Sequence, residues 1–159
     1  MEKLEKLKKE REKLDKKIEA LEYAERIFEE GDEIYYVDQF GIVNCGKWDN
    51  FAWIDAAFSQ GHIFRTKQAA ELESKRRNLL TRFKAFRDEC NGDWKLNWNK
   101  NDAKYYLYKS STTGDILCND IYFYETFSLF GYFKNEEDAE RAIKLFGQEI
   151  IELFVEGDA

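Results

Sequence analysis

The sequence predicts an α+β fold: a long N-terminal coiled-coil-like helix followed by two tandem βββα repeats, each a small antiparallel sheet packed by a helix. A heptad-like spacing of leucines fills the beginning of the chain. Short tyrosine- and isoleucine-rich runs then alternate with glycine-containing turns. The stretch FRTKQAAELE, residues 64–73, is echoed by FKNEEDAERA, residues 133–142. We therefore expect three parts, at residues 1–30, 31–92 and 93–159.

The first part, residues 2–29, is predicted to be one helix. Its apolar residues recur at alternating steps of three and four, which gives a narrow coiled-coil-like stripe. Gly31 follows at a position suited to a C-cap. We expect the stripe to contact a partner or a second copy of the chain. Its central members are Leu7, Leu14, Ile18 and Leu21.

The charges beside the stripe disfavour a parallel homodimer. In that arrangement Lys3 would face Lys8 and Glu10 would face Asp15, so two of the three flanking pairs would repel. Charged residues also occupy two positions within the stripe. An antiparallel pair, a helix of another protein, and packing on the chain's own globular part remain open.

The first repeat is predicted to contain strands at 34–37, 42–45 and 62–64, with an aromatic-rich loop before the third strand. Thr66 is expected to cap a helix that runs to about Cys90.

The second repeat is predicted to contain strands at 103–108, 116–118 and 131–133, with residues 121–124 as an alternative continuation of the second strand. A helix from 136 to about 155, capped by Asn135, is predicted to follow. Its residues align with those of the first. The aligned pairs are Tyr35-Tyr36 with Tyr105-Tyr106, Phe58-Ser59 with Phe127-Ser128, Phe64 with Phe133, Thr66 with Asn135, and Ala70-Glu71 with Ala139-Glu140. We expect the repeated phenylalanine to dock the third strand in the core, and the alanine to let the helix lie close to the sheet.

Composition places limits on function. The 159 residues include 16% aromatics, enough for a core, and 32 acidic against 25 basic residues give a formal net charge of −7. That balance argues mildly against non-specific binding to DNA or anionic membranes. Three widely spaced cysteines and no signal peptide indicate a reducing cytoplasm, and no apolar run is long enough to span a bilayer.

Several segments together resemble a known group of proteins. The pattern GDEIYYVDQFGIV, then KWDN, then GHIFRTKQAAE is similar to a domain common in uncharacterised proteins of Gram-positive phages and mobile elements. Two further segments resemble the family's link into its second half and its final segment; they are DECNGDWKLNWNKNDAKYYLY and FGYFKNEEDAERAI. This chain departs from the family at Gln68-Ala69, where acidic residues are usual. The resemblance implies a phage or prophage accessory protein in the host cytoplasm, with no activity or site to transfer.

No motif predicts catalysis, a metal or a cofactor. His62 is the single histidine, and a lone histidine at the start of a strand is more often structural than catalytic. Cys45 and Cys118 fall on the second strand of each repeat, but with one histidine a zinc site is weakly supported, and buried thiols fit better. No nucleophile elbow or phosphate-binding glycine loop is present.

Two surface features remain as candidate binding sites. Residues 65–87 carry eight basic and two acidic residues, typical either of a solvated helix face that pairs with acidic helices or of a contact for nucleic acid or an acidic partner. The candidate contacts are Lys75, Arg76, Arg77, Arg82, Lys84 and Arg87. Aromatics of the two long loops are mostly expected in the core, and any exposed ones would anchor a protein partner. The candidate anchors are Trp48, Trp53, Tyr122 and Tyr124.

Three functions follow as hypotheses. The first is a non-catalytic protein-binding module, a phage-encoded inhibitor or adaptor acting on a host or defence protein such as a CRISPR nuclease. The second is a nucleic-acid-binding accessory protein that uses the basic 65–87 helix. The third is a homo-oligomeric scaffold built through the N-terminal helix.

Overall fold

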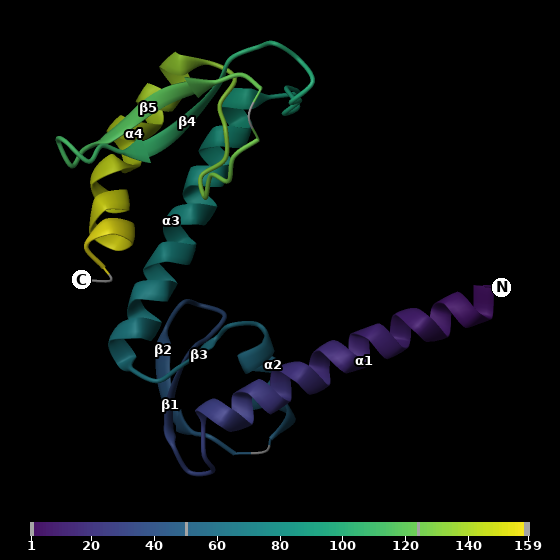
Figure 1. The fold of residues 1–159 in the computed structure, drawn as a ribbon. Helices are drawn as coiled ribbons and strands as arrows, with labels where there is room; N and C mark the ends of the chain where they lie inside the picture. The colour runs from purple at the N-terminus through teal and green to yellow at the C-terminus, as the bar shows by residue number, and fades with distance from the viewer. Residues whose placement is uncertain (1, 50, 124, 158–159) are drawn as a thin grey trace. The chain divides into compact units, whose positions relative to one another are not determined.

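A computed structural model describes residues 2–49, 51–123 and 125–157, and it has the predicted α+β class (Figure 1). The chain divides into two compact units, Met1–Ser74 and Lys75–Ala159. Each unit contains one small antiparallel sheet. The elements in order are α1 (Glu2–Ile27), β1 (Glu33–Val37), β2 (Val43–Lys47), α2 (Ala52–Ser59), β3 (Ile63–Phe64), α3 (Lys67–Asn91), β4 (Lys104–Lys109), β5 (Ile116–Ile121), α4 (Glu136–Ile150) and η1 (Ile151–Val155).

The sheet of the first unit has the strand order β2-β1-β3, with antiparallel pairing throughout. The β1–β2 hairpin closes through a turn in which Asp38 accepts backbone N–H bonds from Phe40 and Ile42 at 2.9 Å. Gly41 supplies the positive φ of 79° that this turn requires. The turn therefore sets the register in which Val37 faces Val43.

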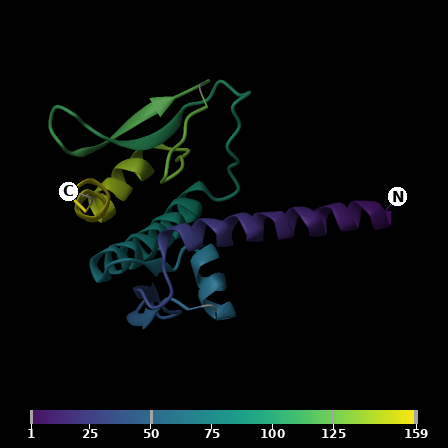
Figure 2. The ribbon, with the colours of Figure 1, turned by 60° about the horizontal axis from the view of Figure 1, so that its bottom comes forward.

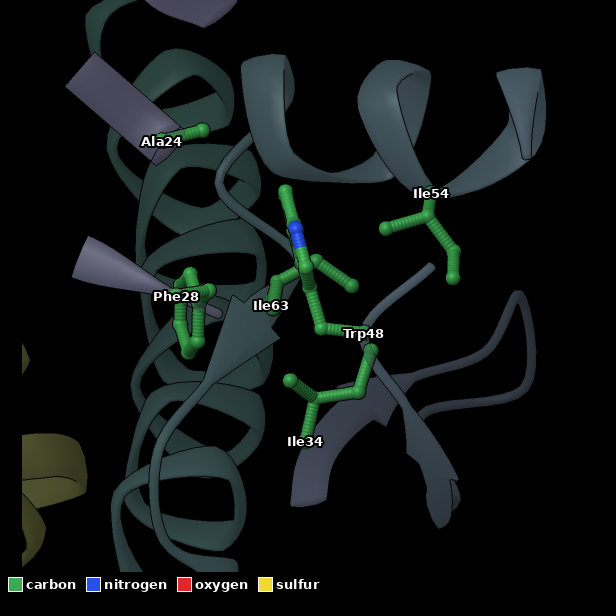
Figure 3. Packing of buried hydrophobic residues seen from close by; sticks show 6 residues of the cluster. All are labelled: Ala24, Phe28, Ile34, Trp48, Ile54 and Ile63. Carbon is green, nitrogen blue, oxygen red and sulfur yellow. The ribbon is translucent and has the colours of Figure 1, made fainter. Parts of the chain in front are cut away.

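The core of the first unit draws residues from four elements and their flanking loops, and Figure 3 shows their side chains pointing toward one another. The rings of Phe28 and Trp48 stack with centroids 4.9 Å apart, and Phe58 meets both edge-on. Ile34 and Ile54 are fully buried beside them. Aromatic packing of this kind compensates for the small size of the sheet.

Only the C-terminal end of α1 enters this core. Ala24 is fully buried, and Phe28 follows directly after the helix. In Figures 1 and 2 the N-terminal part of α1 projects away from the remainder of the first unit. Gly31 does not cap the helix as predicted: it lies in a turn where Asp32 N–H bonds Glu29 O, because the helix already ends at Ile27.

Helix α2 occupies the segment that was predicted to be a loop. The short helix buries Ile54 in the core. The rings of Tyr36 on β1 and Trp53 on α2 form a T-shaped pair with centroids 5.3 Å apart, which holds the helix against the strand. Gly61 then reverses the chain with a φ of 69° and leads into β3.

The second unit contains the β4–β5 hairpin, with α4 packed against both strands. The predicted third strand is reduced to one bridge between Tyr105 and Phe133. The helix predicted to reach residue 155 is α-helical to Ile150 and ends in the π-helical turn η1.

The core of the second unit is a cluster of phenylalanines supplied by α3, α4 and the bridge segment. Phe83 is fully buried, with ring centroids 4.8 Å from Phe130, 5.8 Å from Phe133 and 5.3 Å from Phe146. Because Phe83 lies on α3, the compact units divide inside this helix and not at its end near residue 92, where the sequence had suggested a boundary.

The pairing of strands supports the internal repeat. Tyr35 pairs with Phe64 in the first unit, and the aligned Tyr105 pairs with Phe133 in the second. Ala70 and its counterpart Ala139 are both fully buried, which allows the close helix packing that the repeat predicts. The phenylalanines differ, however: Phe133 is fully buried, whereas Phe64 is half-exposed.

Candidate protein-binding surfaces

The segment between β5 and Phe133 exposes several large apolar side chains. We call residues 122–129 the aromatic loop; Tyr124, a predicted anchor, lies outside the described residues. The predicted anchor Tyr122 is 43% exposed, Phe123 58%, Phe127 109% and Leu129 56%. Few soluble domains leave so many large apolar groups in one short segment unless the segment meets a partner.

A buried lysine fixes the start of the aromatic loop. The Lys104 ammonium is fully buried and donates to Tyr122 O at 3.1 Å. It also donates to Lys100 O at 3.1 Å and to the carbonyl and carboxylate of Asp102 at 2.8 Å each. Four acceptors and the Trp98 ring 5.4 Å away satisfy this cation. Lys104 therefore has a structural role, in which it ties the start of the loop to the segment before β4.

A second set of bonds fixes the other end of the aromatic loop. The Tyr132 hydroxyl lies 2.5 Å from Thr126 Oγ1 and also donates to Thr126 O. Gly131 N–H bonds Ser128 O at 3.1 Å. Gly131 has φ 72°, a conformation that strains other residues, and a Cβ there would also displace the Arg87 guanidinium, so glycine is strongly favoured. The loop therefore presents its aromatics from a fixed backbone.

Charges near the loop stabilise particular protonation states. The hydrogen bond and charge of Lys104 hold the pKa of Asp102 below its usual value, which keeps the carboxylate ionised beside the buried ammonium. A hydrogen bond to Asp120 raises the pKa of Tyr122, so its phenol stays neutral. The exposed surface of the loop is thus mainly aromatic and apolar, with Glu125 as its one exposed charge among the described residues, an amphipathic composition found at many protein interfaces.

The two predicted tryptophan anchors have different environments. Trp48 is only 5% exposed and stacks on Phe28, so it is a core residue and not a surface anchor. Trp53 is 49% exposed, with one edge packed on Tyr36. Phe51 beside it is also exposed, so Trp53 remains available to a partner.

The stripe of α1 is exposed along the projecting part of the helix. Its apolar side chains are between 38% and 59% exposed, which is high for residues of this size. The exposed members are Leu4, Leu7, Leu14, Ile18 and Leu21. Packing on the chain's own globular part is therefore not the arrangement observed for these five residues; in the described part of this segment, Ala24 and Phe28 are buried in the core and Ile27 packs partly against it.

A groove of about 440 Å³ continues this stripe between α1 and α2. Its walls are mainly apolar, and Lys17 and Asp55 lie at its edges. The apolar lining residues are Ala20, Leu21, Ala52, Ala56 and Phe58. Leu21 belongs to both the stripe and the groove, so the two form one continuous apolar surface.

Three arginines of the predicted basic contact are engaged within the second unit. Arg76 donates to Leu153 O at 2.7 Å and lies over the Phe154 ring, thereby capping the C-terminal turn. Arg82 pairs with Glu149 at 2.5 Å, and Arg87 donates to Phe130 O at 3.0 Å.

The other predicted basic contacts are Lys75, Arg77 and Lys84, also on α3; Lys75 and Lys84 are exposed and Arg77 is half-buried. The ion pair of Arg82 with Glu149 of α4 follows the predicted pairing of a basic helix with an acidic helix, whereas Arg76 and Arg87 are held by backbone carbonyls.

Histidine and cysteine residues have structural surroundings. A ring nitrogen of His62 lies 3.3 Å from Val37 O. Cys45 lies opposite Tyr35, whereas Cys118 lies opposite Leu107, so the two cysteines are not at equivalent places in the repeats. Burial and the nearby Glu136 and Glu140 raise the pKa of Cys118 to about 11.

Among the described residues, no group of three or more His, Cys, Asp or Glu side chains is placed to hold a metal ion. No helix in the described part of the chain is long and apolar enough to cross a membrane. Comparisons with models of protein families, with curated proteins and with solved structures find no match.

Sequence reasoning missed Phe123 and Leu129 as exposed residues, and it did not foresee the groove. Both depend on tertiary structure: the groove needs α2 beside α1, and the loop needs Lys104 and Tyr132 to hold it. The one available signal was the run IYFYETFSLF, which is too apolar for an ordinary solvated loop.

Proposed function

We propose that the protein is a non-catalytic protein-binding module that docks a partner protein through the aromatic loop. The observation that carries this proposal is the exposure of Phe123 and Phe127 on a backbone fastened at Tyr122 and Thr126. Aromatic side chains have few rotatable bonds, so on a fastened backbone they lose little entropy on binding, and aromatic residues are enriched among those that dominate interface energies.

The biological setting of the proposal comes from the resemblance to phage and mobile-element proteins. In that setting the protein acts in the cytoplasm of the host cell as an inhibitor or adaptor of a host or defence protein. The net charge of −7 supports a protein partner over nucleic acid, since phosphate binding requires an excess of available cations. The engaged Arg76, Arg82 and Arg87 support the same preference.

Affinity capture with matched variants tests this function. The tagged protein is expressed in a Gram-positive host, the lysate is split with and without nuclease, and bound proteins are identified by mass spectrometry. Phe127→Ala and Phe123→Ala are captured in parallel with Leu145→Ala, which removes a side chain of similar exposure from α4.

A stoichiometric partner that survives nuclease, is lost with Phe127→Ala and is retained with Leu145→Ala is the expected result. Nucleic acid as the only bound species would instead support the basic-helix alternative. A partner retained by both phenylalanine variants would show that the aromatic loop is not the contact.

A further inference from the structure

The exposed stripe of α1 has charges on both flanks that select one pairing geometry. In heptad terms Leu4, Arg11 and Ile18 occupy position a, and Leu7, Leu14 and Leu21 occupy position d. Lys8 and Asp15 flank one side at position e, and Glu10 and Lys17 flank the other at position g. We propose that α1 pairs with α1 of a second copy as an antiparallel two-helix coiled coil, in the register that places Leu4 beside Leu21 of the other copy.

This register buries the whole exposed stripe. Leu4 packs with Leu21 of the second copy, Leu7 with Ile18, and Leu14 with the alkyl stem of Arg11. Each contact occurs twice because the pair has twofold symmetry. The Arg11 guanidinium keeps its contact with Asp15, 3.6 Å away on the same helix, and stays at the edge of the seam.

The four central flanking charges, those of Lys8, Glu10, Asp15 and Lys17, all meet opposite charges in this register. In an antiparallel pair, e positions face e positions and g positions face g positions. Lys8 then meets Asp15 of the second copy, and Glu10 meets Lys17, again twice each.

Neighbouring registers are disfavoured by like charges. A shift of one heptad in one direction brings Glu10 onto Glu10 and Lys8 onto Lys8 of the second copy. A shift in the other direction brings Asp15 onto Asp15 and Lys17 onto Lys17. Lys8 would attract Glu22 in that register, but Leu7 would face Glu25 within the seam. The flanking charges and the apolar stripe together therefore specify orientation and register, which is how these positions act in coiled coils.

The first unit is shaped to accept the second helix. The other copy's N-terminal turn reaches the level of Ala24, where α1 becomes buried in its own unit, so the second helix ends where the globular part begins. There Leu4 of the second copy meets the groove that Leu21 forms with Ala52 and Ala56. Lys3 of the second copy lies on the g side, toward α2 and Asp55.

Charge-exchange variants of the full chain test the proposal by sedimentation equilibrium. The wild type is expected to dimerise reversibly. Lys8→Glu and Asp15→Lys each turn two attractions into repulsions and should each raise the dissociation constant about tenfold. The double variant restores opposite charges and should return the dissociation constant to near the wild-type value.

The same variants distinguish the antiparallel dimer from a parallel one. In a parallel dimer, Lys8→Glu would place a carboxylate opposite Lys3, and Asp15→Lys would place an ammonium opposite Glu10. Each single change would therefore strengthen association. Lys9→Glu, on the opposite side of α1, is the matched control and should leave the constant unchanged, with helix content checked by circular dichroism.

A disulfide test then fixes the register, with the three native cysteines replaced by serine. A mixture of Leu4→Cys and Leu21→Cys chains should cross-link on oxidation, whereas Leu4→Cys alone should not. A monomeric wild type, tighter association of the single charge variants, charge variants without effect, or cross-linking of Leu4→Cys alone would each overturn the proposal. Dimerisation is independent of binding by the aromatic loop, so failure of either leaves the other standing.

Discussion

The segment that joins the second strand to the third is packed against the core in the first unit and exposed in the second. In the first unit this segment forms α2, which buries Ile54 and packs Phe58 on the core. In the second unit it forms the aromatic loop, in which Phe127 is fully exposed. The first segment stabilises its own unit by packing on the core. The backbone of the second segment is fixed away from the core by hydrogen bonds from Lys104 and Tyr132.

A one-residue shift contributes to this contrast. Phe58 and Phe127 align by sequence, but Gly61 N–H bonds Phe58 O whereas Gly131 N–H bonds Ser128 O. Ser128, not Phe127, therefore occupies the turn position of Phe58. Two related segments can thus differ in exposure because a single residue moves the side chain relative to the turn.

The two cores also differ in where their aromatics come from. Phe28, Trp48 and Phe58 of the first unit lie at or just beyond the ends of α1, β2 and α2, whereas Phe83 and Phe146 of the second lie within helices α3 and α4. We therefore expect the stability of the second unit to depend on one buried aromatic side chain, Phe83, more than the stability of the first unit depends on any one of its aromatics.

Removing the centre of the second core should have the largest effect. Phe83→Ala deletes a fully buried ring that contacts three other phenylalanines, so we expect a loss of about 3–5 kcal/mol in the free energy of unfolding. Urea denaturation gives the total, and amide hydrogen exchange should locate the loss in residues 75–157. Leu145→Ala, an exposed change in the same unit, should be nearly neutral. Equal loss of protection in both units would contradict the separation of their cores.

Unfastening the aromatic loop should have the next largest effect. Lys104→Met keeps the aliphatic stem but leaves the carbonyls of Lys100, Asp102 and Tyr122 without their donor, so we expect roughly 2–3 kcal/mol of destabilisation. Amide exchange should rise first in residues 122–129. The exposed Lys109→Met on the same strand provides the control. Unchanged exchange in the loop would show that Lys104 does not hold it.

Acid should weaken the hairpin turn of the first unit. Backbone N–H bonds from Ile42 and Phe40 lower the pKa of Asp38 in the folded state. A lowered folded pKa adds stability above the unfolded value of about 4, and that stability is lost as pH falls through the folded pKa. Asp38→Asn should therefore flatten the decline in melting temperature between pH 5 and pH 2, in thermal scans of both proteins. The corresponding turn of the second unit is held by the neutral Ser110 hydroxyl, so Ser110→Ala should leave this pH dependence unchanged.

Thiol labelling should distinguish β2 from β5 by the reactivity of their cysteines, and we expect this comparison to involve the smallest effect on stability. Cys45 is exposed, whereas burial raises the pKa of Cys118 to about 11. At pH 8 only about one thiol in a thousand is ionised at that pKa, so Cys118 should react slowly with maleimide. Mass spectrometry of timed samples should find Cys45 modified first. Faster labelling of Cys118 would contradict the partial burial of its thiol.

The sequence by itself determined the local structure. Heptad spacing, turn glycines and the repeated aromatic-cap-alanine pattern led to α1, the two hairpins and the helices α3 and α4, because these signals act between near neighbours. It also identified the α1 stripe and the exposure-prone aromatics as candidate contacts, together with Trp48, which proved to be in the core.

Tertiary structure alone decided which aromatics are buried, where the units divide and what the basic residues of α3 do. Each depends on contacts between residues distant in sequence: Trp48 on Phe28, Phe83 on Phe146, and Arg82 on Glu149. Secondary-structure signals act between residues that are close in sequence, whereas the burial of a side chain depends on which distant surfaces meet in the folded chain.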